Sequence, residues 1–261
     1  MARRVSQKAW DTYTKRLEAQ RMEAYDVAYA WVMKHGLGGG MSTKALVRMM
    51  VEDAIYNGRA TAALAAAYFD QVAIAEEADV VKAVAVNDPT DVRVRRMSIA
   101  ANRAKPKWIA GDREGYARAI ASAVAADVKR QATNTIMLNA QKNGAEYAWI
   151  PGGNETCAFC IAIASAGWQP ARKATAMGMH ADHIHDNCKC EFAIRFDEST
   201  KYDGYDPQKY ADIYDEADGR SSQAKINSIR REQYAENKDK INEQHRERYA
   251  AMDGYRKDED E

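Results

Sequence analysis

The chain has 261 residues, a length that fits one large domain or two modest ones. Its 38 basic and 38 acidic residues cancel, so no global positive charge indicates a polyanion-binding protein. Leu, Ile, Val and Phe together number 38, about 15% of the chain, below the roughly 20% that a self-sufficient core needs. Much of the remaining apolar content is alanine. We therefore predict an Ala-rich helical protein with a thin core that partners complete.

The N-terminus carries no apolar segment, and no stretch approaches the ~18 apolar residues of a membrane span. The sequence therefore predicts a protein made in a cytoplasm, without a membrane partner. Thiols stay reduced there, so the four cysteines are better explained as metal ligands than as disulfides.

Residues 1–144 predict a helical domain. Apolar periodicity predicts helices over residues 5–34, 42–56, 59–78 and 112–142. Gly38-Gly39-Gly40 separates the first two, and Asn57-Gly58 is expected to turn the chain between the second and the third. Asn143-Gly144 is typical of a helix C-cap.

The most basic local stretch follows Pro89 and extends to Lys107, just after Pro106. Against one acid, Asp91, it carries Arg93, Arg95, Arg96, Arg103, Lys105 and Lys107. We interpret a charge run of this size as a solvated loop. Contact with DNA or with an acidic protein surface remains open, so a nucleic-acid-binding zinc module is one alternative function.

Residues 145–196 are the part of the chain with β character. Tyr147–Ile150 predicts a short strand, Pro151–Asn154 a tight turn, and Cys190–Phe196 an alternating strand. The fold class that follows is mainly α (α+β), with a helical domain at 1–144, a zinc-stapled β unit at 145–196 and a charged, partly helical tail at 197–261.

The tail contains a short repeat, since Lys225-Ile226-Asn227 recurs as Lys240-Ile241-Asn242. The two copies are fifteen residues apart, which corresponds to about 4.2 helical turns and places both on nearly one face of a helix. We interpret 220–257 as a solvated, charge-paired helix rather than as a specific binding helix.

Two cysteine clusters predict a zinc site. Cys157-x-x-Cys160 supplies one pair, and His185-x-x-Cys188-x-Cys190 supplies the other ligands. Structural zinc takes four tetrahedral Cys or His ligands from two converging pairs. We expect Cys157 and Cys160 with two or three of His185, Cys188 and Cys190, and a site with all four cysteines stays open. His180 and His183 are expected to lie at the surface or to contact the ligands without binding the metal themselves.

A redox dithiol and buried free cysteines account for the two clusters less well. A redox Cys-x-x-Cys normally follows a strand in a thioredoxin-like βαβ pattern, which this sequence lacks. Accidental clustering of all four cysteines with three of the five histidines is improbable. Since no catalytic Glu accompanies the cluster, we predict a structural rather than a catalytic zinc ion.

Several segments resemble a known signature. Trp149-Ile150-Pro151, Glu155–Cys160, Ala164–Trp168 and His185–Cys190 resemble the C-terminal part of phage minor head proteins, the head-morphogenesis proteins similar to the F protein of phage Mu. Tyr56–Ala65 and Tyr68-Phe69-Asp70 resemble a helical segment of the variants from phages of actinobacteria. The resemblance covers about residues 50–196, and the charged repeat lies outside it.

The resemblance implies a low-copy structural protein of the virion, made in the bacterial host cytoplasm. It would lie inside the head near the portal and serve capsid assembly or DNA packaging and ejection. Its implied partners are the portal protein and the major capsid or scaffold proteins, with packaged DNA as a further contact of the basic stretch.

An HNH-like zinc-containing nuclease is the second alternative function, because Asp182-His183-Ile184 resembles part of that motif. Catalysis there needs a further Asn and His downstream, placed by a ββα-metal unit. Here Cys188 and Cys190 follow within seven residues of His183, and after His185 the next histidine is His245 in the charged repeat. A protease would need a nucleophile setting such as G-x-S-x-G, and a zinc deaminase would need H-x-E. The sequence contains no G-x-S-x-G, and its cysteine pair precedes the histidines rather than following an H-x-E, so we predict no enzymatic activity.

Overall fold

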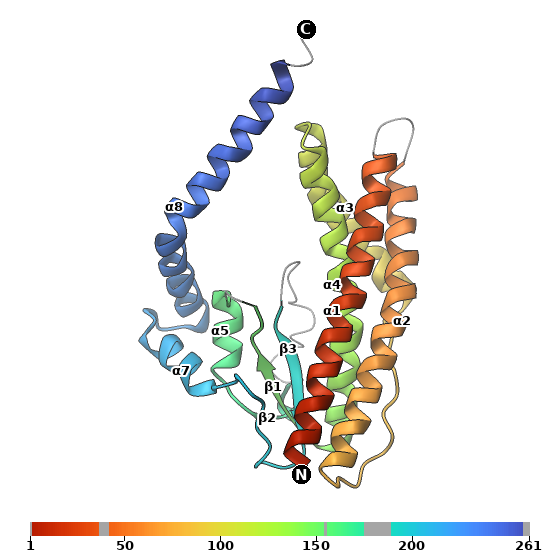
Figure 1. The fold of residues 1–261 in the computed structure, drawn as a ribbon, viewed down its shortest axis with the longest axis vertical. Coiled ribbons are helices and arrows are strands. Elements are labelled where there is room, and N and C mark those ends of the chain that lie inside the picture. The colour runs from red at the N-terminus through yellow and green to blue at the C-terminus, as the bar shows by residue number, and fades with distance from the viewer. Residues whose placement is uncertain (1, 37–41, 154–155, 175–188, 258–261) are drawn as a thin grey trace. The chain divides into compact units, whose positions relative to one another are not determined.

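The computed structural model describes residues 2–36, 42–153, 156–174 and 189–257. The fold is mainly α with a small antiparallel sheet, as the sequence predicted (Figure 1). The chain packs into two compact units. The bundle unit comprises Met1–Gly153 and Trp168–Tyr205, and the C-terminal unit comprises Asn154–Gly167 and Asp206–Glu261. The domain boundaries predicted at 144 and 196 stay a prediction. The two compact units meet along the chain after Gly153, Gly167 and Tyr205.

Three long helices build the bundle unit: α1 (Ala2–His35), α2 (Thr43–Ala75) and α4 (Arg113–Asn143). They lie side by side, and α3 (Thr90–Ile109) packs on α2 and α4 (Figure 1). Where they meet, the buried side chains are largely alanine, which lets helix backbones approach closely. The larger residues of this core include Leu46, Met50, Tyr116, Ile120 and Val124.

The helix ends in this unit follow the predicted signals. Ser42 caps α2 by accepting a hydrogen bond from the Ala45 N–H, at 3.2 Å. Gly144 ends α4 with a φ of 73°, a conformation that favours glycine. No helix in the described part of the chain is both long enough and apolar enough to cross a membrane.

The turn predicted at Asn57-Gly58 is wrong, because α2 runs through both residues. The Asn57 amide is bonded within the bundle, donating to the Asp53 carboxylate at 2.6 Å. Gly58 serves close approach instead: a Cβ there would lie 2.9 Å from Cγ of Gln131 and 3.0 Å from Nη2 of Arg93. The glycine therefore makes room for side chains from α3 and α4.

The sheet has the order β2-β1-β3 and is antiparallel throughout. Its strands are β1 (Glu146–Ile150), β2 (Gln169–Pro170) and β3 (Glu191–Arg195). The strands predicted at 147–150 and 190–196 are confirmed. Phe192 stacks on Tyr147 and meets Trp149 edge-on, with ring centroids 5.2 and 4.7 Å apart. The sheet packs against α4 and α2, and the short α6 (Ala171–Ala174) follows β2.

The C-terminal unit consists of α5 (Ala158–Ala164), α7 (Pro207–Glu216) and α8 (Ser222–Lys257). Its small core contains Ala158, Ile161, Ala217, Ile226 and Ile229. The charged C-terminal helix predicted over 220–257 is confirmed, and its first repeat copy contributes Ile226 to this core. The Ile241 side chain of the second copy lies outside the described residues.

Candidate functional site

The register of the sheet shows where the chain leaves β1 toward the first predicted ligand segment and where it enters β3 from the second. Ile150, the last residue of β1, lies opposite Glu191, the first residue of β3. Cys157 and Cys160 follow β1 along the chain, whereas Cys190 immediately precedes β3. Both segments therefore depart from the same end of these two strands.

Close packing at this end depends on two glycines after β1. A Cβ at Gly152 would lie 2.4 Å from the carbonyl oxygen of Lys189, and one at Gly153 would lie 2.9 Å from its Cδ. Gly153 also has a φ of 83°, which other residues rarely adopt. Gly152 and Gly153 thus pack directly on Lys189, next to Cys190 in the chain, which explains why both positions need glycine. The predicted turn extends to Asn154, which lies outside the described residues.

Cys157 and Cys160 lie at the start of α5. Cys157 precedes the helix, and its sulfur accepts a hydrogen bond from the Cys160 N–H at 3.4 Å. Such a bond favours a thiolate, the form in which cysteine binds zinc. Cys160 is buried, and Cys157 is partly exposed. The donor chemistry of this pair therefore fits a zinc ion.

Cys190 is 3% exposed and lies beside a buried cation of α4. Lys129, which is 0% exposed, donates a hydrogen bond from Nζ to the Cys190 carbonyl oxygen. Its Nζ also lies 2.8 Å from Oε1 of Glu191 and 5.9 Å from the centroid of the Trp149 ring. Sequence reasoning missed Lys129, because a lysine in an Ala-rich helix is typical of a solvated face.

The remaining predicted ligands, His185 and Cys188, lie outside the described residues, as do His180, His183 and the Asp182-His183-Ile184 motif. Among the described residues, no three His, Cys, Asp or Glu side chains gather where they could hold a metal ion. The zinc ion and its ligand set therefore stay predictions, supported at Cys157, Cys160 and Cys190 by the local structure.

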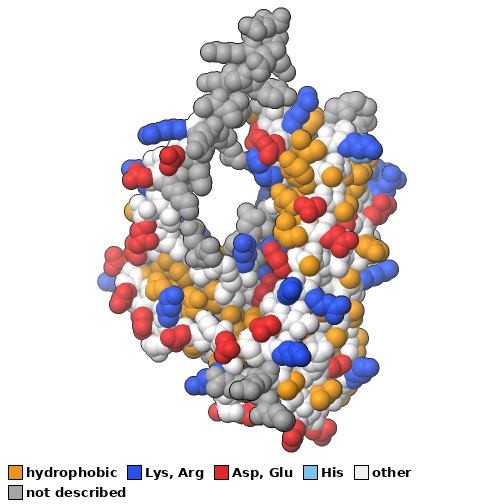
Figure 2. Space-filling model, viewed as in Figure 1, with side chains coloured by type: hydrophobic (Ala, Val, Ile, Leu, Met, Phe, Trp, Pro, Cys, Tyr) orange, Lys and Arg blue, Asp and Glu red, His pale blue; other side chains and the backbone are white. Residues whose placement is uncertain are grey.

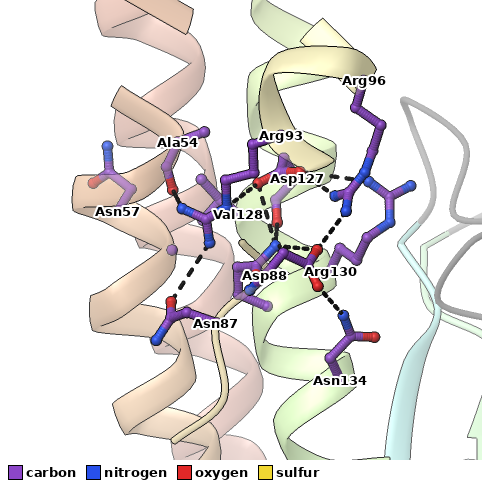
Figure 3. A network of polar contacts seen from close by, with 12 residues as sticks. Ala54, Asn57, Asn87, Asp88, Arg93, Arg96, Asp127, Val128, Arg130 and Asn134 are labelled. Atoms are coloured by element: carbon purple, nitrogen blue, oxygen red, sulfur yellow. Dashed lines mark hydrogen bonds and ion pairs between the residues drawn. The ribbon is translucent and has the colours of Figure 1, made fainter. Parts of the chain in front are cut away.

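The basic stretch contributes to a buried polar network instead of forming a loop (Figure 3). Arg93 is 1% exposed; its Nε lies 3.3 Å from Oδ2 of Asp127, and its Nη1 donates to the Ala54 carbonyl at 3.2 Å. Arg96 pairs with Asp127 and, at 2.5 Å, with Asp88. The network ties the start of α3 to α2 and α4.

The two carboxylates of this network differ in their environment. Burial raises the pKa of Asp127, and the neighbouring arginines offset this only in part. Burial also acts to raise the pKa of Asp88, but hydrogen bonds from Arg96 and Gln131 outweigh it, so that this pKa is lowered. The partners of Asp88 therefore outweigh the effect of burial on its pKa, whereas burial outweighs the partners of Asp127.

The prediction of a solvated loop at this stretch is wrong, since the charge run forms α3 and turns part of its positive charge inward. A buried Arg93 is not available to DNA or to a protein partner, and Arg96 is occupied by two carboxylates. The exposed cations that remain as candidate contacts are Arg95, Arg103, Lys105 and Lys107.

A second polar system joins α4 to residues 79–89, here called the strap, which run between α2 and α3. Backbone N–H groups of the strap donate to side chains one helical turn apart on α4. The pairs are Val81 with Asn143, Val84 with Asn139, Val86 with Thr135 and Asp88 with Gln131, at 2.8 to 3.0 Å. Four residues of α-helix rise about 6 Å, which is close to the length of two residues of extended chain. The spacing of these bonds therefore shows that the strap runs extended along α4.

Comparison with known proteins gives one family. Residues 4–217 match the model of a family described as VG15 protein. The match includes α1 to α7, the sheet and both cysteine clusters, and it ends before α8. No curated protein and no solved structure gives a significant match.

Proposed function

The chain belongs to the VG15 protein family, which indicates a phage-encoded protein, and we propose that it is a phage minor head protein with a structural zinc centre. In this proposal the protein lies inside the head, near the portal, and acts in capsid assembly or in DNA packaging and ejection. The observation that carries the proposal is the segment 147–196. It resembles the signature of head-morphogenesis proteins, and its two cysteine segments depart from one end of the β1–β3 pair.

The proposed zinc ion is held by Cys157, Cys160 and two or three of His185, Cys188 and Cys190. Bound zinc supplies a cross-link between chain segments that bury too little apolar area to hold themselves together. The N–H···S bond at Cys157 and the glycine packing beside Lys189 support this arrangement, because they order the chain near both clusters.

Partners that complete the surface are part of the proposal. Large apolar side chains remain exposed on the helical bundle, where Figure 2 shows hydrophobic groups between charged ones. They include Met22, Val27 and Met33 of α1 and Val92 and Ile99 of α3. Exposed apolar groups beside the cations of α3 support docking on a larger assembly, for which we propose the portal and the major capsid or scaffold proteins.

We test the portal contact by co-expression of this chain with the portal protein of the same phage, followed by gel filtration. A complex that survives the column, and that weakens when residues 1–34 are deleted or Cys157 is replaced by serine, supports the proposal. Separate elution of the two intact, folded proteins at micromolar concentration would contradict the portal contact.

A further inference from the structure

The outer face of α3 carries cations that have no partner within the described part of the chain. The inner face of this helix is buried on the bundle, and Figure 3 shows Arg93 and Arg96 directed at carboxylates there. On the opposite side Arg95, Arg103 and Lys105 are exposed. None of these three side chains forms an ion pair or a hydrogen bond with another described residue. Their charge is therefore available to a partner.

Apolar side chains lie between these cations on the same face. Val92, Arg95, Ile99, Arg103 and Pro106 recur at intervals of three or four residues, which places them in one row along the helix, here called the α3 row. Val92 and Ile99 are 38% and 43% exposed, so each presents apolar surface to water near an unpaired arginine. At 1.5 Å per residue the row is about 21 Å long, close to four helical turns.

We infer that the α3 row is a docking surface for an amphipathic helix of another head protein. The acidic residues of that helix pair with Arg95 and Arg103, and its apolar residues cover Val92 and Ile99. The inference rests on the proposed function, because it takes the partner to be a portal, capsid or scaffold protein of the same phage. Side chains at intervals of three and four residues form the ridge that one helix packs into the groove of another, which is why a helix fits the row.

A protein partner fits the α3 row better than DNA does. Duplex DNA offers phosphates to the arginines, but its backbone has no apolar groups that would cover Val92 and Ile99. The net charge of the chain is zero, so no general attraction to a polyanion adds to the local contact. Burial of exposed apolar groups, in contrast, favours association with another protein.

The test measures how much of the full-length chain enters proheads, by quantitative mass spectrometry with the portal protein as the internal reference. A plasmid supplies the chain to a phage that lacks its gene. Arg95→Glu/Arg103→Glu reverses the charge of the row, Arg95→Lys/Arg103→Lys keeps it, and Ile99→Ser removes apolar surface without a change in charge. Arg231→Glu/Lys238→Glu is the matched control, since it reverses two exposed cations on one face of α8.

We expect the amount of chain in proheads to fall about tenfold or more in Arg95→Glu/Arg103→Glu, because like charges then face each other across the interface. Ile99→Ser should lower it severalfold, whereas the lysine variant and the α8 control should stay near the wild-type amount. All of these positions are exposed, so the melting temperatures should be unchanged. Wild-type incorporation of Arg95→Glu/Arg103→Glu, or an equal loss in the α8 control, would overturn the docking surface.

Two further measurements separate the possible partners. Carbodiimide joins lysine amines to carboxylates in direct contact, and in proheads we expect it to link Lys105, beside the row, to an acidic residue of another head protein. Fluorescence anisotropy with a labelled DNA duplex tests the nucleic acid. Duplex binding near physiological salt that is lost in Arg95→Glu/Arg103→Glu but kept in Ile99→Ser would assign the row to DNA and overturn the inference. Absence of the unaltered chain from proheads would instead contradict the proposed function, so the two failures are distinguishable.

Discussion

At the scale of single residues, the protein depends on polar side chains that are buried with their partners. Arg93, Asp127 and Lys129 lie in the bundle interior, each in an ion pair. One pair joins α3 to α4, and the other joins α4 to β3. Such pairs add little net stability but make the removal of one partner expensive. Cysteines that share a metal are also expensive to remove, because metal binding supplies folding energy, and this makes the proposed zinc ligands the most informative residues to change.

Cys157→Ser removes a proposed ligand and its N–H···S bond, so we expect loss of zinc and of the folding energy that metal binding supplies. Native mass spectrometry of the unaltered chain should show one zinc ion per monomer, and the variant should be metal-free and sensitive to protease. Ala162→Ser, a change in the same short helix without a ligand role, is the control and should keep its zinc. A folded, metal-free wild-type chain with two disulfides would contradict the prediction.

Asp53 gives the protein a pH dependence that can be measured separately. Burial raises the pKa of this carboxyl from 3.8 to about 6, although a hydrogen bond from Asn57 acts in the opposite direction. Because the folded state takes up the proton more readily than the unfolded state, Asp53 favours folding at low pH. Its contribution is lost as the pH rises from about 4 to about 6.

Asp53→Asn should therefore flatten this part of the stability curve and raise the free energy of unfolding at pH 7. We expect about 1 kcal/mol, since the carboxyl is partly open to solvent. Urea denaturation between pH 4 and 7 measures the difference, with Glu52→Gln at the neighbouring exposed position as the control. A variant that shows the same pH dependence as the wild type would show that Asp53 is not the cause.

At the scale of elements, α4 organises the bundle unit through its polar face as much as through its apolar one. Gln131, Thr135, Asn139 and Asn143 recur every fourth residue and hold the strap. Such a row is typical of a solvated helix face, yet three of its four members are buried. Asp88, at the end of the strap, forms an ion pair with Arg96 of α3. The polar row on α4 therefore holds the residues that lead into α3.

Asn139→Ala tests the strap, because Asn139 both accepts from the N–H of Val84, at 3.0 Å, and donates to its carbonyl, at 2.9 Å. Loss of both bonds leaves two backbone groups without their partner, and we expect a cost of about 1–3 kcal/mol. Hydrogen exchange followed by mass spectrometry should show faster exchange over 79–89. Lys142→Ala, on an exposed position of the same helix, should leave that exchange unchanged, and equal protection in Asn139→Ala would contradict the arrangement.

Patterns within one element were predictable from the sequence. Apolar periodicity and end signals located α1 and α4, and the charged repeat located α8. The change of residue pattern after Gly144 located β1, and alternation located β3. Contacts between distant elements could not be predicted in this way. From the sequence alone Gly58 predicts a turn, and only the structure shows that it makes room for Arg93 and Gln131. The basic run of α3 likewise predicts a loop from the sequence alone, and only the structure shows that Asp127 of α4 pairs with one of its arginines. β2 has two residues and shows no alternation that would predict it.

The candidate site follows the same division. Residue type and spacing within each cluster were sufficient to predict Cys157, Cys160 and Cys190 as ligands. The pairing of Ile150 with Glu191, where the chain leaves β1 and enters β3, could be seen only in the β1–β3 register. Lys129 has no sequence signal at all, because its partners come from a strand far along the chain.

At the scale of the whole molecule, we expect no nuclease activity. After His185 the next histidine is His245, in the charged repeat, so the sequence does not offer the later His that an HNH centre needs to bind a catalytic metal ion. Incubation of the purified chain with plasmid DNA and Mg²⁺, Mn²⁺ or Ni²⁺ should leave the DNA intact. Metal-dependent cleavage that disappears in His183→Ala would make the protein an enzyme and favour the nuclease.

The thin core fits a protein that is completed by a larger assembly, as does the zinc centre that we propose. Leucine occurs only five times in 261 residues, and the bundle buries many small alanine side chains in its place. Apolar groups on α1 and α3 remain exposed in the isolated chain. A protein of this kind gains stability when partners cover those groups, which agrees with membership in a family of phage proteins.

Quantitative proteomics of purified phage particles tests the central claim most directly, because it asks whether the chain is part of the head. We expect the protein in mature particles or proheads at a few to a few tens of copies, on the order of one-tenth or less of the major capsid protein, since one portal vertex offers few docking sites. Absence from both mature particles and proheads, with the portal protein detected in the same samples, would contradict the assignment as a minor head protein.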